Sequence, residues 1–192
     1  TCLKQLSELP VAQYNRSVQL AYWINLYNAL TVETVLQHYP VKSIRDIKLG
    51  GWFESGPWDA KLIKVDGIPL SLNDIEHRII RPIWNDPRTH YALNCASYSC
   101  PNLQKQVYTG KTINTMLAQA AKAYINNPRS VLIKNNMLIV SSIYDWYQAD
   151  FGGSEQAVIR HVMQYAKPVL KRQLSTFHVI SDYHYDWRLN GN

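Results

Sequence analysis

The sequence predicts an α+β fold in a single domain, residues 1–192, that is rich in helices and has short antiparallel strands. Three observations lead to this prediction. The chain has 192 residues and is 46% hydrophobic, which is enough to build a sizeable core. Helical patterns cluster along the chain instead of alternating regularly with strands. Two pairs of short apolar runs flank turn signals, which is typical of hairpins.

The first half of the chain contains one strong helical pattern and several shorter elements. The strongest helix ends before Pro40. Asp66-Gly67 lies between two apolar runs and predicts a hairpin. Ser71 caps the next helix, with Asp74 three residues on in a variant of the capping box. In chain order we expect helices over residues 1–9, 16–38 and 43–49, a hairpin over 61–70 and a helix over 72–81.

The second half opens with a predicted strand, residues 90–94, that leads directly into Cys95. Asn135-Asn136 marks the turn of a second hairpin, and Gly152-Gly153 stops a helix. The elements expected after the strand are a helix over 112–126, a hairpin over 131–140, helices over 142–150 and 154–167, and a last strand over 177–181.

Charge and hydropathy argue against two classes of partner. The formal net charge is +6 and the pI is about 9.2, but only 18% of residues are charged. The densest basic run, residues 167–172, is interrupted by three uncharged residues, so we do not expect nucleic-acid binding. The most apolar stretch, residues 20–36, contains five polar or charged residues, so we expect no membrane span.

The chain opens at Thr1 rather than at Met. We therefore expect that an upstream segment has been removed, and a periplasmic or secreted location if that segment held an export signal. The chain has three cysteines, which allow at most one intrachain disulfide.

Three predicted helices carry polar residues on their apolar faces. Asn25 and Asn28 share a stripe with apolar residues of the long helix. Glu76 lies on the face of Leu72 and Ile79, and Asp150 lies on the face of Ile143 and Trp146. A buried carboxylate is costly unless it is paired or hydrogen-bonded. Two interpretations remain open: one common polar centre, or separate structural contacts.

Residues 90–101 contain two of the three cysteines and are the most informative stretch. Cys95 follows a predicted strand, and Cys100 precedes Pro101, which is typical of a helix start. Either setting lowers a thiol pKa and favours a nucleophilic thiolate. Cys95 is the candidate nucleophile, with Cys100 as the second choice.

A cysteine nucleophile needs a base and a group that orients the base. His90 lies five residues before Cys95 on the predicted strand and would point to the opposite face, so His77 is the favoured base. Glu76 or Asp150 is the candidate orienting group. Asn94 or backbone N–H groups are the candidate donors to an oxyanion.

Other interpretations of these residues stay open. Cys95 and Cys100 are also compatible with a loop disulfide. A zinc site of both cysteines with His77 and His90 is a third interpretation, although the spacing is not standard. The loop over residues 50–59 is unusually aromatic, and the residues expected to line a cleft or bind substrate are Asn25, Asn28, Trp52, Trp58, Trp146 and Tyr147.

Five blocks of the chain resemble a known family. They are Ala-Tyr-Trp-Ile-Asn-Leu-Tyr-Asn-Ala-Leu-Thr (21–31), Leu-Asn-Asp-Ile-Glu-His (72–77), Asp-Pro-Arg-Thr-His-Tyr-Ala-Leu-Asn-Cys (86–95), Ser-Cys-Pro (99–101) and Trp-Tyr-Gln-Ala-Asp-Phe-Gly (146–152). The chain is similar over about residues 16–153 to the family catalogued as domain of unknown function 547, with residues 154–192 as an extension.

This resemblance implies a shared fold and a shared site but no established reaction. Members occur in bacteria, often with export signals, and in plants, where the domain follows a coiled-coil region. Many relatives have a glycine or smaller residues where this chain has Ala96-Ser97-Tyr98, a difference that would narrow the approach to Cys95.

Two functional hypotheses follow. The first is a thiol-dependent hydrolase or acyl-transferase with a Cys/His/carboxylate site and no cofactor, distantly like cysteine peptidases or transglutaminases. In papain-like enzymes, however, the histidine follows the cysteine, whereas the favoured histidine here precedes it. The second is a non-catalytic binding module with a structural Cys95–Cys100 disulfide. The partner in either case is a peptide, a glycan or a small molecule.

Overall fold

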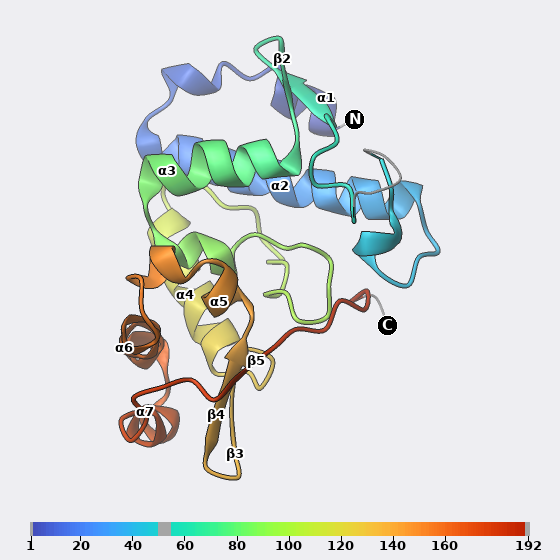
Figure 1. Ribbon diagram of the computed structural model, residues 1–192. Coiled ribbons are helices and arrows are strands. Elements are labelled where there is room, and N and C mark those ends of the chain that lie inside the picture. The colour runs from blue at the N-terminus through green and yellow to red at the C-terminus, as the bar shows by residue number, and fades with distance from the viewer. Residues whose placement is uncertain (1, 50–54, 191–192) are drawn as a thin grey trace.

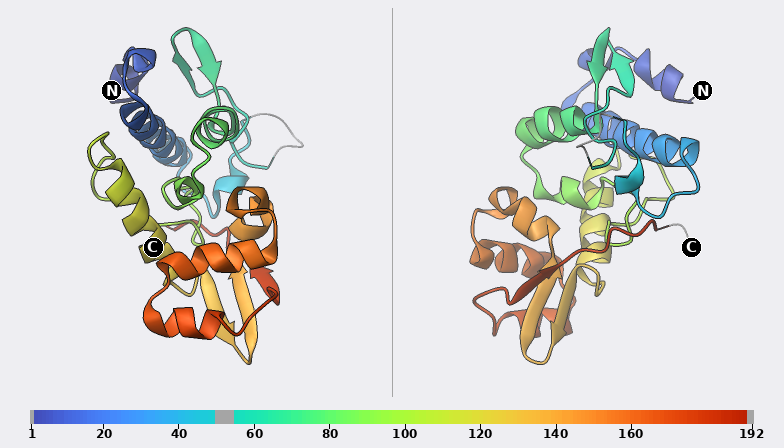
Figure 2. Two further views of the ribbon diagram at one scale, coloured as in Figure 1. Left: turned by 90° about the vertical axis from the view of Figure 1, so that its left-hand side faces the viewer. Right: turned by 45° about the vertical axis from the view of Figure 1, so that its right-hand side comes forward.

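The computed structural model describes residues 2–49 and 55–190, without the side chain of Cys2, and it confirms the α+β fold. Helices dominate, and the strands form two small sheets (Figure 1). The N-terminal elements gather at one end of the molecule and the C-terminal elements at the other (Figure 2). Each end has its own hydrophobic core.

Helix α2 (Arg16–Gln37) is the centre of the N-terminal end, as its strong helical pattern predicts. The side chain of Asn15 caps it by accepting a hydrogen bond from the backbone N–H of Val18 at 3.1 Å. The helix packs against a hairpin and a second helical segment in the first core. The other elements at this end are α1 (Cys2–Ser7), η1 (Val11–Gln13), η2 (Ile44–Asp46), β1 (Ile63–Val65), β2 (Ile68–Leu70), η3 (Asp74–Ile80) and α3 (Arg81–Trp84).

The hairpin of β1 and β2 forms at the predicted turn. Val65 pairs with Ile68, and Asp66 and Gly67 between them both have positive φ. Two consecutive left-handed residues make the tight turn that Asp-Gly favours. The predicted hairpin is therefore confirmed.

The helix after Ser71 begins as the sequence predicts and ends later. The Ser71 backbone N–H donates to Asp74 Oδ2 at 2.8 Å, and the Asp74 N–H donates to Ser71 Oγ at 3.1 Å, which confirms the capping box. The segment continues through Pro82 to Trp84, so the predicted end near Arg81 was too early. The turn before Pro82 is widened, because the Arg81 N–H donates to the carbonyl of Glu76, five residues back.

The C-terminal end combines a three-stranded sheet with helices. Strands β3 and β4 form the predicted antiparallel hairpin, and β5 pairs with β4 in parallel. Helix α4 contacts elements at both ends of the molecule. The elements here are η4 (Pro87–Tyr91), α4 (Ile113–Ile125), β3 (Val131–Lys134), β4 (Met137–Ser141), α5 (Ile143–Trp146), η5 (Gln148–Phe151), α6 (Glu155–Tyr165), α7 (Pro168–Leu174) and β5 (Asp182–His184).

Two predicted strands were placed wrongly. The last strand comprises residues 182–184 and not 177–181, because the parallel pairing with β4 begins only at Asp182. No strand forms over residues 90–94. The 3-10 helix η4 ends at Tyr91, and a loop follows it. Asp86 caps that helix by accepting from the backbone N–H of Arg88 at 3.0 Å, and Pro87 begins it.

The segment after β5 runs back from the C-terminal sheet toward the N-terminal end (Figure 1). There, the backbone N–H of Leu189 donates to the carbonyl of Lys42 at 2.8 Å, and Leu189 also forms an isolated bridge with Ser97. The segment therefore lies against the loop that contains Cys95 and Cys100. None of the described helices is both long and apolar enough to cross a membrane.

Candidate functional site

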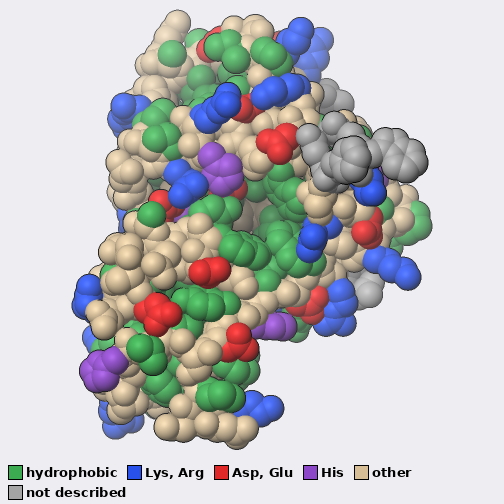
Figure 3. Space-filling view, viewed as in Figure 1, with side chains coloured by type: hydrophobic (Ala, Val, Ile, Leu, Met, Phe, Trp, Pro, Cys, Tyr) green, Lys and Arg blue, Asp and Glu red, His purple; other side chains and the backbone are tan. Residues whose placement is uncertain are grey.

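A cavity of about 280 Å³ lies where residues from both cores meet. Hydrophobic side chains surround a hollow on this face of the molecule (Figure 3). Aromatic rings make up much of the wall, and the polar side chains among them are few. The lining residues are Tyr27, Trp58, Asn73, Glu76, His90, Leu93, Cys95, Cys100, Pro101, Ile143, Trp146, Tyr147, Tyr185 and Trp187.

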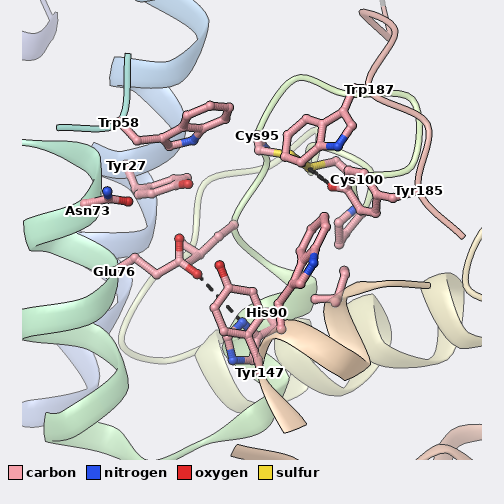
Figure 4. A pocket seen from close by; sticks show the side chains of 14 residues that line it. Tyr27, Trp58, Asn73, Glu76, His90, Cys95, Cys100, Tyr147, Tyr185 and Trp187 are labelled. Atoms are coloured by element: carbon pink, nitrogen blue, oxygen red, sulfur yellow. Dashed lines mark hydrogen bonds and ion pairs between the residues drawn. A yellow bond between two sulfur atoms is a disulfide. The ribbon is translucent and has the colours of Figure 1, made fainter. Parts of the chain in front are cut away.

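Glu76 supplies a buried carboxylate to the cavity, and its residue is only 7% exposed. It lies close to two tyrosines, Tyr27 and Tyr147 (Figure 4). Burial raises the pKa of Tyr27 and of Tyr147, and the charge of Glu76 raises both pKa values further. Both phenols therefore keep their protons and serve as hydrogen-bond donors beside the carboxylate.

His90 is the histidine that faces Glu76. Its Nε2 lies 2.7 Å from Asp150 Oδ2, and its Nδ1 lies 3.8 Å from Glu76 Oε1. The imidazole stacks on the Tyr147 ring, with 4.2 Å between the centroids. Because Asp150 accepts a hydrogen bond from Nε2–H, the other ring nitrogen is the one available on the side of Glu76.

Asp150 connects His90 to Arg81. Arg81 donates from Nε and Nη2 to the two carboxylate oxygens of Asp150, at 2.6 and 3.0 Å. The hydrogen bond from His90, together with the bonds from Arg81, holds the pKa of Asp150 well below its usual range. Arg81 also lies over the Tyr147 ring, 4.8 Å from its centroid. This network fixes the orientation of the His90 imidazole.

Cys95 and Cys100 are joined in a disulfide that forms part of the cavity wall. The Cys95 backbone N–H donates to Cys100 Sγ at 2.8 Å, and the Tyr185 hydroxyl lies 3.1 Å from Cys95 Sγ and 3.4 Å from Cys100 Sγ. Burial raises the pKa of Tyr185 to about 12. In this oxidised state neither cysteine is a thiol.

The side chains of the three asparagines predicted for the site form hydrogen bonds to backbone groups. Asn94 donates to the Pro101 carbonyl at 2.7 Å and accepts from the Ala96 N–H, so its amide spans the disulfide loop. Asn28 donates to the Ala92 carbonyl and accepts from the Asn94 N–H. Asn25 makes the same pair of contacts with the backbone of Tyr108. None of the three lines the aromatic cavity.

The other predicted site residues divide into three groups. Glu76, Cys95, Cys100, Trp58, Trp146 and Tyr147 line the cavity. Asp150 and His77 lie outside it: Asp150 binds His90, and Nδ1 of His77 lies 3.0 Å from Arg81 Nη1. Trp52 lies outside the described residues.

The predicted orientation of His90 is wrong. His77 is exposed and does not line the cavity, whereas His90 does, together with both cysteines. The argument against His90 assumed alternating side chains on a strand. Because η4 and the loop after it replace that strand, His90 and Cys95 face the same space.

Sequence reasoning missed several lining residues, notably Tyr27, Tyr185 and Trp187. Tyr185 and Trp187 lie two residues apart beyond β5, a spacing that places both side chains on one side of an extended segment. This spacing is the signal by which the sequence could have revealed them.

The position of the Trp58 ring depends on the absence of a side chain at Gly56, which has a φ of +91°. A Cβ on Gly56 would lie 1.8 Å from the Trp58 ring.

The residues of the zinc interpretation do not form a ligand set. Cys95 and Cys100 are bonded to each other, and no group of three or more His, Cys, Asp or Glu residues in the described ranges could hold a metal ion.

Fold and cavity together define an α+β domain with an aromatic pocket that contains a buried carboxylate and a histidine. The chain belongs to the family described as protein of unknown function, DUF547, whose model matches residues 11–125. Glu76, His90 and both wall cysteines lie in the matched segment, whereas the cavity residues from Ile143 to Trp187 lie beyond it. No curated protein and no solved structure matches the chain.

Proposed function

We propose that this protein is a ligand-binding module and that the Cys95–Cys100 disulfide is a structural part of its binding site. The disulfide is the main observation that supports this proposal. The polar contacts of the Cys95 sulfur are with Ser97 and Tyr185, and neither sulfur has a hydrogen bond to His77 or His90. The cysteines therefore serve to shape the wall of an aromatic cavity.

Several contacts hold the loop of the disulfide in place and support a structural role. Tyr124 donates to the Ser99 carbonyl at 2.7 Å, and Arg129 donates to the carbonyls of Tyr98 and Cys100. Ser99 Oγ accepts from the Asp186 N–H at 2.8 Å. A wall fixed from three sides keeps its shape before a ligand arrives, which lowers the entropic cost of binding.

Alkylation tests the state of the cysteines. The chain has three cysteines, so denatured but unreduced protein should take up one iodoacetamide adduct, on Cys2, and reduced protein should take up three. A Cys95→Ser/Cys100→Ser double variant should lose about 2 kcal/mol of unfolding free energy, because a short cross-linked loop is released. Three adducts on protein isolated without reductant would contradict the structural role.

Calorimetric titration tests ligand binding. The probes are N-acetyltryptophan amide, N,N′-diacetylchitobiose and choline, which represent a peptide, a glycan and a small molecule. Asn73 lines the cavity and is only partly buried, so Asn73→Trp should fill the space without disturbing either core. At least one probe should bind to the unaltered protein and lose at least tenfold in affinity in this variant. If no probe binds, the proposal loses its support.

A thiol-dependent hydrolase or acyl-transferase is a second candidate, favoured by one observation. The Cys95 N–H and the Tyr185 hydroxyl both contact Cys100 Sγ in the cavity that also contains His90. After reduction by an external dithiol, these donors would stabilise a Cys100 thiolate. The thiolate would attack a carbonyl carbon, His90 would protonate the leaving group, and water would then release the acyl group from sulfur.

Thiol reactivity tests this second candidate. With reduced protein, His90→Ala should slow alkylation of Cys100 by iodoacetamide at least tenfold at neutral pH if the imidazole promotes thiolate formation. His77→Ala is the matched control, because His77 lies on the same network but outside the cavity, and it should change the rate less than twofold. Equal rates in both variants and the unaltered chain would exclude a thiol–histidine pair.

A further inference from the structure

The cavity contains a buried negative charge without a lysine or arginine partner. Among the described residues, no lysine or arginine nitrogen lies within 4.0 Å of the Glu76 carboxylate, and the basic group that does is His90 Nδ1, at 3.8 Å. Arg81 adds a favourable field, but its guanidinium is bound at both carboxylate oxygens of Asp150. His90 is therefore the nearest basic group to the Glu76 carboxylate, and it is already bound to Asp150 through Nε2. A buried carboxylate in this setting attracts a cation.

Aromatic rings surround the space beside this carboxylate. Figure 4 shows Glu76 and Tyr27 on one side of the cavity, Trp58 above them, and Tyr185 and Trp187 on the opposite side. Trp187 contacts Trp58 and Trp146, with 5.7 and 5.6 Å between ring centroids, so the rings form a continuous wall. Aromatic faces carry partial negative charge and attract cations, especially where water is excluded.

The protein itself already places cations on two of these rings. The guanidinium of Arg81 lies 4.8 Å from the centroid of Tyr147, and that of Arg45 lies 5.3 Å from the centroid of Trp187. Tyr147 and Trp187 thus already contact positive groups. The lining contains one carboxylate, that of Glu76, and none of the described lysine or arginine residues.

We propose that the cavity binds an alkylated ammonium group, with the positive nitrogen beside Glu76 and its alkyl groups against Tyr27, Trp58 and Trp187. This inference rests on the proposed ligand-binding function and specifies the chemical class of the ligand. The carboxylate supplies the charge that selects a cation. The rings supply apolar contact and cation–π attraction, and the apolar wall disfavours a strongly hydrated inorganic ion.

Choline and its neutral isostere 3,3-dimethylbutan-1-ol test the proposal by calorimetric titration of the intact chain. The two molecules have nearly the same shape and differ in the charge of the central atom. Choline should bind at least tenfold more tightly than the isostere. N-Acetyl-trimethyllysine amide carries the same head group on a peptide side chain, and its affinity relative to choline shows whether the natural source is a peptide or a free small molecule.

Two variants complete the experiment. Glu76→Gln keeps the size of the side chain and removes its charge, so it should lower the affinity for choline at least tenfold and leave that for the isostere within twofold. Glu33→Gln, on the exposed face of α2, removes one charge outside the cavity and should change neither. Thermal unfolding of both variants checks that the fold is retained.

Each outcome decides the inference. Preference for choline that disappears in Glu76→Gln supports it. Equal affinity for choline and the isostere, with both lost in Asn73→Trp, overturns the cation proposal but leaves the ligand-binding function in place. If neither compound nor the peptide analogue binds, the cation proposal fails. Binding of the tryptophan or chitobiose probe would then preserve the broader function.

Discussion

Asp74 and Glu76 lie two residues apart in η3, and both are almost fully buried, yet their surroundings differ. Asp74 lies at the start of the helix and is saturated by partners: the ammonium of Lys61, the backbone N–H and hydroxyl of Ser71, and the guanidinium of Arg78. Glu76 faces a cavity and has only His90 as a basic neighbour within 4.0 Å in the described chain. The comparison teaches that two carboxylates buried to the same extent on one helix can differ in how many partners they have. Asp74 is surrounded by donors, whereas Glu76 lines a cavity.

The largest expected difference between the two carboxylates is in stability. Asp74→Asn should lower the free energy of unfolding by about 2 kcal/mol, because a charged acceptor of several hydrogen bonds and a helix cap are lost together. Glu76→Gln should change it by less than about 1 kcal/mol, because no ion pair to lysine or arginine is broken and the amide oxygen still accepts from the phenols of Tyr27 and Tyr147. Urea unfolding followed by circular dichroism measures both. Equal losses in the two variants would refute the expectation that the partners of Asp74 contribute more to stability than those of Glu76.

A smaller effect is expected in the acid range. The hydrogen bond from Lys61, with those from Ser71, lowers the pKa of Asp74 from 3.8 to about 2. Because the folded-state pKa is below the unfolded value, the unfolded chain takes up the proton first as the pH falls. The contribution of Asp74 to stability is thus fully present above about pH 4 and is lost as the pH falls through about 2.

This linkage predicts a shallower acid dependence for Asp74→Asn than for the unaltered chain. The measurement is the unfolding free energy of both proteins at several pH values between 4 and 2, at constant ionic strength. The difference between them isolates Asp74 from Asp150, whose pKa is shifted in the same direction. Parallel curves would mean that Asp74 is not held in its charged form by its partners.

The smallest effect concerns the outer partner of Asp74. Arg78 Nη1 lies 3.3 Å from Asp74 Oδ1, but the Arg78 side chain is 80% exposed. Arg78→Ala should therefore cost only about 0.3–0.5 kcal/mol, as is typical of exposed pairs one helical turn apart. Raising the salt concentration should shrink the difference further. If Arg78→Ala lowered the free energy of unfolding as much as Asp74→Asn does, the ion pair rather than the cap would be the main stabilising contact at this helix start.

The predicted elements that were confirmed rest on signals within a few residues. Asp66-Gly67 specified its turn, because both residues tolerate the left-handed backbone, and Ser71 with Asp74 specified a helix start. The periodicity that placed Glu76 on the buried face of its helix was also correct. These features depend on local sterics and hydrogen bonding, which neighbouring residues determine.

The candidate site was predicted less well, and the reason is specific. Residues 90–94 are an apolar run too short to show a period, and the stronger signal was the Asp86-Pro87 cap just before them. Because a strand was predicted here, we expected His90 to point away from Cys95 and favoured His77 as the base. Tyr185 and Trp187 enter the cavity only because β5 pairs with β4 and the chain then runs back past Ser97.

The amino-acid sequence by itself determined the helical start at Ser71, the two hairpins, the long helix α2 and the inward position of Glu76. Only the tertiary structure decided that Cys95 and Cys100 are bonded to each other, that His90 meets Asp150, and that rings from distant segments enclose one space. Local elements follow from the covalent neighbourhood of each residue. A cavity arises from the packing of segments far apart in the chain, whose relative positions are determined by the fold as a whole.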